Sequence, residues 1–179
     1  KQSYQFGVKS YNCFGVKNLF LQGELNVVRP YMYSHYDGES NYAHLNQSLA
    51  HPWGANFYEI VARAQYNHKR LYLQYKMNFG QWGDDITTEN GEFLNYGNDV
   101  YNDYRNYYHI NGTHGHYLLT GEKNTLLMNN IVISWLVNPS YNLNIFADIT
   151  HRSHSIENSN KLNDFIINEA HLYRNELIA

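Results

Sequence analysis

Regular alternation of apolar and polar residues is the feature that most limits how this chain can fold. Four segments show it most clearly, at residues 19–27, 58–66, 70–79 and 142–152. Successive side chains of a β-strand point to opposite sides, so each segment predicts a strand with one apolar and one polar side. Less regular candidate strands lie at 4–9, 126–137 and 163–173. The pattern therefore predicts an all-β, antiparallel fold of about seven strands.

The connections between these segments alternate in length. Short turns are expected at about 11–17, 67–70 and 138–141, and long surface loops at about 30–56, 80–125 and 153–162. A soluble sandwich has no reason to place every long loop at one end, whereas outer-membrane barrels have short periplasmic turns and long extracellular loops. Strands of roughly 9–11 residues also suit a tilted crossing of a bilayer. We therefore predict an up-and-down transmembrane β-barrel, with a soluble antiparallel sheet as the alternative.

Composition excludes several other classes of protein. Only 16% of the residues are charged, while the chain has 18 Tyr and 25 Asn, so amides and phenols supply most of its polarity. A net charge of −3 gives no basic face for nucleic acid. The single cysteine, Cys13, excludes an intramolecular disulfide. A mean hydropathy of −0.61 excludes a helical membrane span, but it is compatible with strands that are polar at every second residue.

The expected number of strands is too small for a complete barrel. A membrane barrel needs about eight strands, because an open sheet edge in lipid leaves backbone groups without hydrogen bonds. The sequence also starts at Lys1 without a Met or a signal region. We therefore expect residues 1–179 to be a single segment, the C-terminal part of a larger barrel.

Five short segments carry a family resemblance, at residues 18–26, 28–35, 41–47, 49–57 and 95–99. They resemble the Wzi-like outer-membrane proteins of capsule assembly, and most of all the gliding-motility proteins of the RemB type. The resemblance implies a non-enzymatic protein in the outer membrane of a Gram-negative bacterium, with its loops facing the cell exterior. It implies a role in surface polysaccharide attachment, capsule assembly or gliding motility. Implied partners are outer-membrane lipid, surface polysaccharide and other outer-membrane or motility proteins.

Polar residues within the predicted strands form the first group of candidate site residues. In a barrel they would face the lumen, where opposite charges on neighbouring strands can pair. The candidates are Glu24, Arg29, Glu59, Arg63, Lys76, Asp148 and Arg152. They would line a small-solute channel or, as we favour, fill a closed interior.

Loop aromatics form the second group. A flat ring that stacks on a sugar, with amide and carboxylate groups beside it, is what saccharide recognition requires. The glycan-contact candidates are Trp53, Trp82, Tyr36, Tyr42, Tyr96 and Tyr104. These rings would equally serve to hold the loops together, and a soluble carbohydrate-binding β-sandwich would use the same residue types.

Evidence for a metal or a reaction is weaker. His114 and His116 have the His-x-His spacing of a metal site, but no carboxylate or cysteine nearby completes a set of ligands. Acidic residues from Asp84 to Glu92 could hold Ca²⁺, although the ordered spacing of a calcium loop is missing. A glycan hydrolase would need two carboxyl groups at a set separation, which the sequence does not fix. We expect neither a cofactor nor an enzymatic activity.

Overall fold

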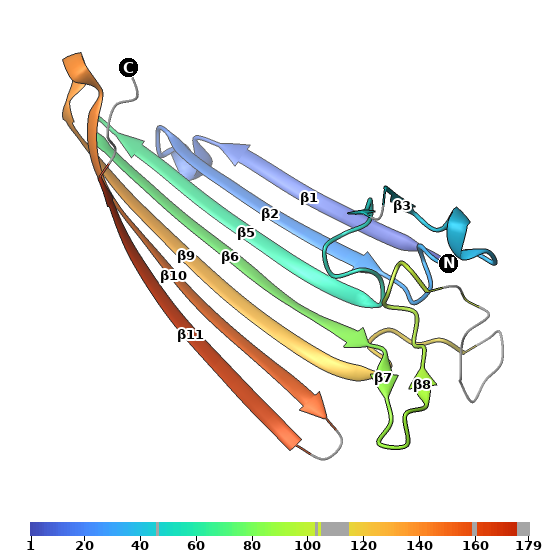
Figure 1. Ribbon diagram of the computed structural model, residues 1–179. Helices are drawn as coiled ribbons and strands as arrows, with labels where there is room; N and C mark the ends of the chain where they lie inside the picture. Colours follow the sequence, from blue (N-terminus) through green and yellow to red (C-terminus); the bar gives the residue numbers. More distant parts are fainter. Residues whose placement is uncertain (46, 103, 105–114, 159–160, 175–179) are drawn as a thin grey trace.

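One antiparallel sheet dominates the computed structural model, which describes residues 1–45, 47–102, 104, 115–158 and 161–174 (Figure 1). Its seven strands, in spatial order, are β1 (Ser3–Tyr11), β2 (Leu19–Val28), β5 (Phe57–His68), β6 (Leu71–Asp84), β9 (Glu122–Asn138), β10 (Leu143–Asn158) and β11 (Lys161–Arg174). Each strand pairs antiparallel with the next, so the topology is up-and-down. The predicted all-β fold is confirmed. In the part of the chain that the structure describes, no helix is long and apolar enough to span a membrane.

The strands extend further toward the long-loop end than the sequence pattern predicts. β6 continues to Asp84 and β9 begins at Glu122, so the second long loop covers 85–121 instead of 80–125. The long loop expected at 153–162 is wrong, because β10 and β11 pair as far as Asn158 and Lys161. Polar residues occupy consecutive positions in this part of β10, which removes the alternation that identifies a strand. Strand pairing continues there without it.

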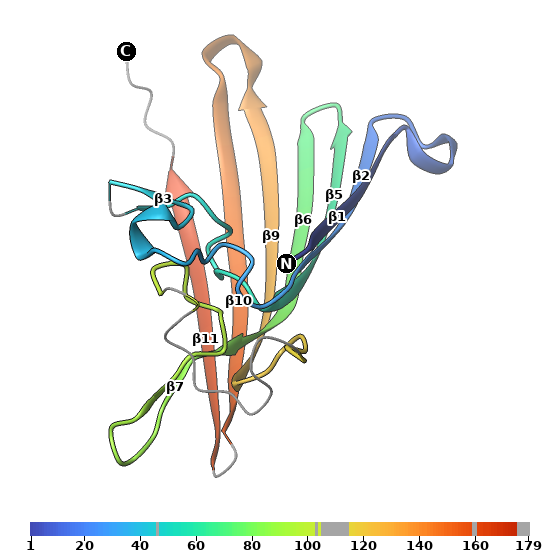
Figure 2. The same cartoon turned by 90° about the vertical axis from the view of Figure 1, so that its right-hand side faces the viewer.

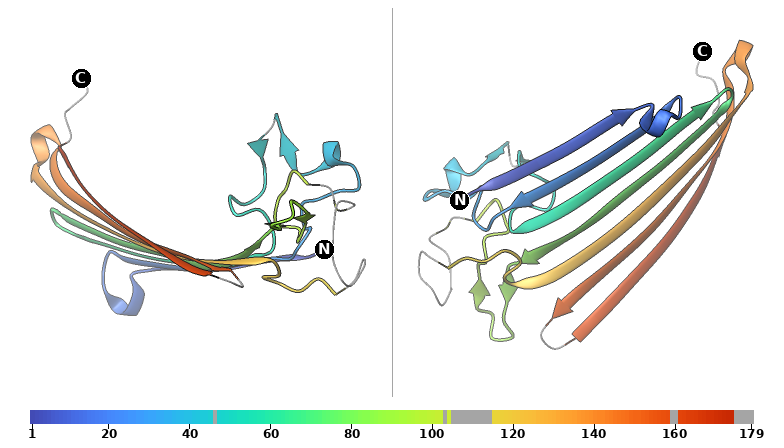
Figure 3. Two further views of the ribbon diagram at one scale, coloured as in Figure 1. Left: turned by 60° about the horizontal axis from the view of Figure 1, so that its bottom comes forward. Right: turned by 180° about the vertical axis from the view of Figure 1, so that it is seen from behind.

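The sheet is open and curved. β1 and β11 are its edges and do not pair with each other within the described residues, so these strands do not close into a barrel. Figure 2 and the left view of Figure 3 show the curvature, and the long loops stand on the concave side. Short connections, including the 3₁₀ turns η1 (Cys13–Gly15) and η3 (Pro139–Tyr141), lie at the opposite end.

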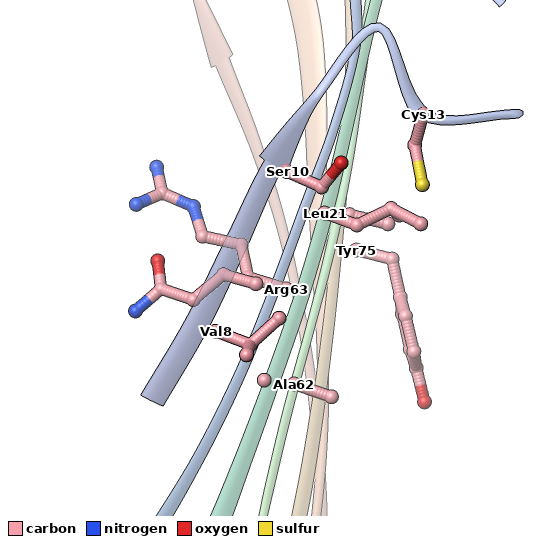
Figure 4. Close-up of a pocket in the computed structure, with 10 residues that line it drawn as sticks. Val8, Ser10, Cys13, Leu21, Ala62, Arg63 and Tyr75 are labelled. Carbon is pink, nitrogen blue, oxygen red and sulfur yellow. The ribbon is translucent and has the colours of Figure 1, made fainter. Parts of the chain in front are cut away.

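The two faces of the sheet differ sharply in chemistry. Figure 4 views the strands nearly edge-on, with Arg63 on one side and Leu21 and Tyr75 on the other. Leu21 and Tyr75 belong to the convex face, where small residues such as Ala62 leave a shallow hollow of about 350 Å³. Arg63 belongs to the concave face, whose middle is lined by amides and charged groups.

The convex face exposes large apolar side chains, while polar side chains near the long loops are buried on the concave face. On the convex face Phe6, Val8 and Ile145 are 65%, 72% and 63% exposed, whereas on the concave face Glu59 and Asn124 are 5% and 2% exposed. Thirteen large apolar side chains of the convex face are exposed, which far exceeds the isolated apolar residues of an ordinary surface. They are Tyr4, Phe6, Val8, Leu25, Ile60, Tyr75, Ile131, Ile133, Trp135, Val137, Leu143, Ile145 and Ile149.

The only buried apolar cluster of the described residues lies on the concave face, where the first long loop packs on the ends of β2, β5 and β6. Phe57 is fully buried with Val28 and Ala55, and Trp53 and Trp82 pack against them. A Cβ on Gly80 would lie 2.2 Å from the Trp53 ring, so the glycine lets the indole lie directly on the sheet. Short elements shape the loops further: η2 (Gly38–Ser40), β3 (Ala43–His44), β4 (Gln47–Ser48), β7 (Ile86–Thr87) and β8 (Phe93–Leu94).

Candidate functional site

The two long loops meet in a cleft above the concave face. The first loop contributes His51 and Trp53, the end of β6 contributes Trp82, and the second loop contributes Asp99 and Tyr101. The cleft has a volume of about 250 Å³, close to the lower end of the range for small-ligand sites. Aromatic and polar side chains line it together, which is the combination that saccharide recognition requires.

Asparagine amides fix the position of the loops around this cleft. Asn98 donates from Nδ2 to the carbonyls of Trp53 (2.9 Å) and Ala55 (2.7 Å), which joins the second loop to the first. Asn56 is fully buried, with Nδ2 donating to the carbonyls of Gly83 (2.9 Å) and Thr120 (2.7 Å). Each amide therefore satisfies carbonyls that a loop would otherwise bury without a partner.

Trp53 and Trp82 form the wall of the cleft. Their rings stack with centroids 5.1 Å apart, and Trp82 also stacks on His154 of β10 at 5.4 Å. The indole N–H of Trp82 donates to the Asp84 carboxylate at 3.0 Å. Because two rings of the protein already engage Trp82, its main contribution is to build the cleft. Tyr101, which is 49% exposed, is the aromatic that a ligand can reach most directly.

Asp85 holds the second loop in place through hydrogen bonds to its backbone. Its Oδ1 accepts hydrogen bonds from the backbone N–H groups of Tyr96 and Gly97, while Oδ2 is buried without a partner among the described residues. Burial raises the pKa of Asp85 above its usual value, and the backbone donors offset only part of this effect. The ionised form of Asp85 is therefore less stable in the folded protein than in the unfolded chain.

We expect Asp85→Asn to remove a pH dependence of loop stability. Between the ordinary pKa of 3.8 and the raised value, the folded state binds more protons than the unfolded state, so wild-type stability falls as pH rises. The variant keeps an acceptor oxygen for Tyr96 but carries no charge. Chemical denaturation of the loop layer from pH 3 to 8 measures the effect, and Glu89→Gln in the same loop is the control. Equal pH profiles for Asp85→Asn and wild type would contradict this account.

The other predicted glycan contacts lie outside the cleft and pack among the loops. Tyr36 contacts Tyr104 edge to face at 5.9 Å, and Tyr42 stacks on Tyr33 at 5.8 Å. Tyr96 lies beside Gly121 and is held through its backbone by Asp85. The structure thus brings two of the six candidates, Trp53 and Trp82, into one cleft. The other four contribute to contacts within the loops.

Most predicted lumen residues do lie on the concave face. Amides hold its carboxylates: Gln5 and Asn26 donate to Glu24 at 2.8 and 3.1 Å. Glu59 accepts from Asn26 and Asn78 and contacts His51 at 3.1 Å. Among the described residues, no two of the predicted lumen residues form an ion pair with each other.

The remaining five predicted lumen residues have different environments. Asp148 accepts a hydrogen bond from Asn130, Arg63 donates to Gln74 at 3.0 Å, and Arg152 is exposed on the same face. Arg29 lies beyond the end of β2 and donates to the carbonyl of His116 at 2.9 Å, so it is a loop contact. Lys76 lies directly opposite Arg63 in the register.

No metal site is found in the part of the chain that the structure describes. His116 packs edge to face on Tyr31 at 4.8 Å. His114, the other predicted ligand, lies outside the described residues. Asp84 accepts hydrogen bonds from Trp82 and Asn124 (2.9 Å), so its carboxylate belongs to the cleft wall.

Sequence reasoning missed His51 and Asn98 as parts of the site. His51 gave no signal because one histidine ahead of Pro-Trp-Gly has no recognisable spacing. Asn98 is one of 25 asparagines, and only the fold distinguishes it from the others.

No family model, no curated protein and no solved structure matches this chain.

Proposed function

We propose that this chain is part of an outer-membrane β-barrel that contacts lipid through its convex face and binds surface polysaccharide in its loop cleft. The proposal assigns no reaction to the chain. The observation that carries it is the exposed apolar face of the sheet, opposite a polar face on whose long-loop end the loops pack. A soluble carbohydrate-binding sandwich requires the reverse, since its second sheet must cover the apolar face.

The apolar band on the convex face runs obliquely across the strands, as it would on strands tilted in a bilayer. On β2 the band is centred at Gly23, and the register places His151 of β10 at the same level. The apolar residues of β10, Leu143 to Ile149, are centred about five residues further toward the short turns. This is a shift of about 17 Å over four strand spacings that together span about 19 Å. The corresponding tilt is about 40°, within the range of membrane barrels.

The length of the band agrees with this tilt. The alternating part of β2, from Leu19 to Val27, spans about 27 Å along the strand. At a tilt of about 40° it covers about 21 Å of membrane thickness, close to the apolar belt of about 25 Å in outer-membrane barrels. Aromatic residues such as Tyr58 and Tyr66 lie at its two ends on β5, where an interfacial girdle would be.

The cleft supports the second half of the proposal. It lies at the long-loop end, which the family resemblance would place outside the cell. A half-exposed tyrosine, carboxylates and amides converge there in a small volume. Role and partners, in capsule assembly, polysaccharide attachment or gliding motility, are taken from the resemblance alone.

Tyr101→Ala tests glycan binding with little risk to folding. The side chain lines the cleft and is half exposed, so we expect the variant to fold and to lose about tenfold in affinity, about 1.4 kcal/mol of stacking energy. Affinity electrophoresis of the full chain in detergent, through gels containing surface polysaccharide, measures the loss. Tyr141→Ala is the matched control, because Tyr141 is exposed at the opposite end of the sheet. Equal retardation of both variants and wild type would exclude the cleft as the binding site.

A further inference from the structure

A row of positively charged side chains crosses the concave face near the short turns. The register places Lys9 opposite Gln22, Gln22 opposite Arg63, and Arg63 opposite Lys76. Directly opposed residues of antiparallel strands share one face, so all four side chains lie on the concave side at one level. Three of the four are cations.

Arg63 and Lys76 are a repulsive pair without compensation from the protein. Like charges directly opposite each other destabilise a sheet. In the described part of the chain, neither residue has a carboxylate within ion-pair distance. Glu24, on the adjacent level of β2, is engaged by Gln5 and Asn26.

The guanidinium of Arg63 is only partly satisfied. Its Nη2 donates to Gln74, but its Nε is buried without a partner among the described residues. A buried donor left unpaired destabilises the folded state, and more so when the group is charged. Unpaired donors and opposed like charges are unfavourable for the fold, and natural proteins keep such features mainly at functional sites.

The space beside this row is large enough for a ligand. A groove of about 520 Å³ runs along the concave face, lined by Lys9, Arg63, Gln22 and Gln65, among others, and Lys76 lies next to it, opposite Arg63 on the following strand. The amides offer neutral donors next to the cations, which suits a ligand that carries hydroxyl groups around an anionic group.

We propose that the row Lys9, Arg63 and Lys76 binds an oxyanion, the carboxylate, sulfate or phosphate group of a solute on the concave side. The planar guanidinium supplies paired donors to such a group, and the two ammonium groups supply charge. Rings of Arg and Lys serve the same purpose in anion-conducting pores. This site lies toward the opposite end of the sheet from the loop cleft and depends on neither the glycan nor the membrane assignment.

Calorimetric titration of the full chain in non-ionic detergent tests the site. The probes are sodium sulfate, trigalacturonate and, as a neutral sugar, maltotriose. We expect wild type to bind an anionic probe and the double variant Arg63→Gln/Lys76→Gln to lose at least tenfold in affinity. Lys69→Gln, in the exposed β5–β6 turn, is the matched control and keeps wild-type affinity.

The outcomes separate the sources of the anion. Trigalacturonate binding more tightly than sulfate supports an acidic glycan, while equal binding supports a free oxyanion. Binding of maltotriose as tight as that of trigalacturonate, equal affinities for wild type and double variant, or no binding at all would overturn the proposal. Failed folding is a separate matter: without ligand, Lys76→Gln relieves repulsion, so its melting temperature should equal or exceed that of wild type. A lower melting temperature would contradict the repulsion on which the site depends.

Discussion

Ile133→Lys is expected to destabilise the full chain in lipid vesicles by about 2–4 kcal/mol. Ile133 is exposed on the convex face of β9, near the middle of the apolar band that we propose to lie in the bilayer. A lysine there would place a charge in the hydrocarbon core, too far from either interface for the side chain to reach water easily. Denaturant titration of vesicle-inserted protein, followed by tryptophan fluorescence, measures the loss of stability.

Val132→Lys is the matched control, because it places the same charge one residue away on the concave face. Val132 pairs with Gln74 and Asp148, so a lysine would meet polar groups and a carboxylate. We expect its effect in vesicles to be less than about 1 kcal/mol. Equal losses for the two variants, or wild-type protein that is monodisperse without detergent, would exclude a lipid-facing convex surface.

Gly97→Ala is expected to release the second long loop from the first. Gly97 has φ +81°, which costs an alanine about 1–2 kcal/mol, and the new Cβ would lie 2.5 Å from the backbone nitrogen of Tyr31. That nitrogen donates to the Gly97 carbonyl at 2.9 Å, so neither backbone can move without losing the contact. Overpacking adds about 1–3 kcal/mol, for a total of about 2–5 kcal/mol. Hydrogen exchange in residues 29–56 measures the release.

Gly91→Ala separates the two causes of that loss. Gly91 has a similar φ of +80°, but no atom lies within 4 Å of the added Cβ. We therefore expect only the conformational cost, about 1–2 kcal/mol, confined to the turn between β7 and β8. If hydrogen exchange in residues 29–56 were the same in both variants, the contact between Gly97 and Tyr31 would not hold the loops together.

The sheet was predictable because alternation records which side of a strand each residue occupies. Prediction from alternation failed at Ser153–Ser155, where polar residues lie on both faces of the strand. Only pairing with the neighbouring strands keeps β10 extended there. Strand order was equally predictable, since consecutive antiparallel strands tend to be neighbours. The degree to which the sheet closes was not predictable, because it depends on curvature that no local pattern encodes.

The site was predictable only in part. Trp53 and Trp82 were predicted as site residues because they are large rings in predicted loops. The structure stacks the two rings on each other. The stacking of Trp82 on His154, more than 70 residues along the chain, could not be predicted from spacing. Opposite charges in the strands predicted ion pairs between them. In the structure, amide side chains donate hydrogen bonds to the carboxylates instead. Which of several partners a charge meets depends on register and side-chain reach.

The amide bracing of the loops has a consequence for the conditions in which the protein can work. Asn56 and Asn98 hold the loops through neutral hydrogen bonds to backbone carbonyls. Mobile ions screen exposed ion pairs, with a Debye length falling from about 30 Å at 0.01 M to about 3 Å at 1 M, but they leave such neutral bonds almost unchanged. We therefore expect the loop contacts made by Asn56 and Asn98 to depend little on ionic strength.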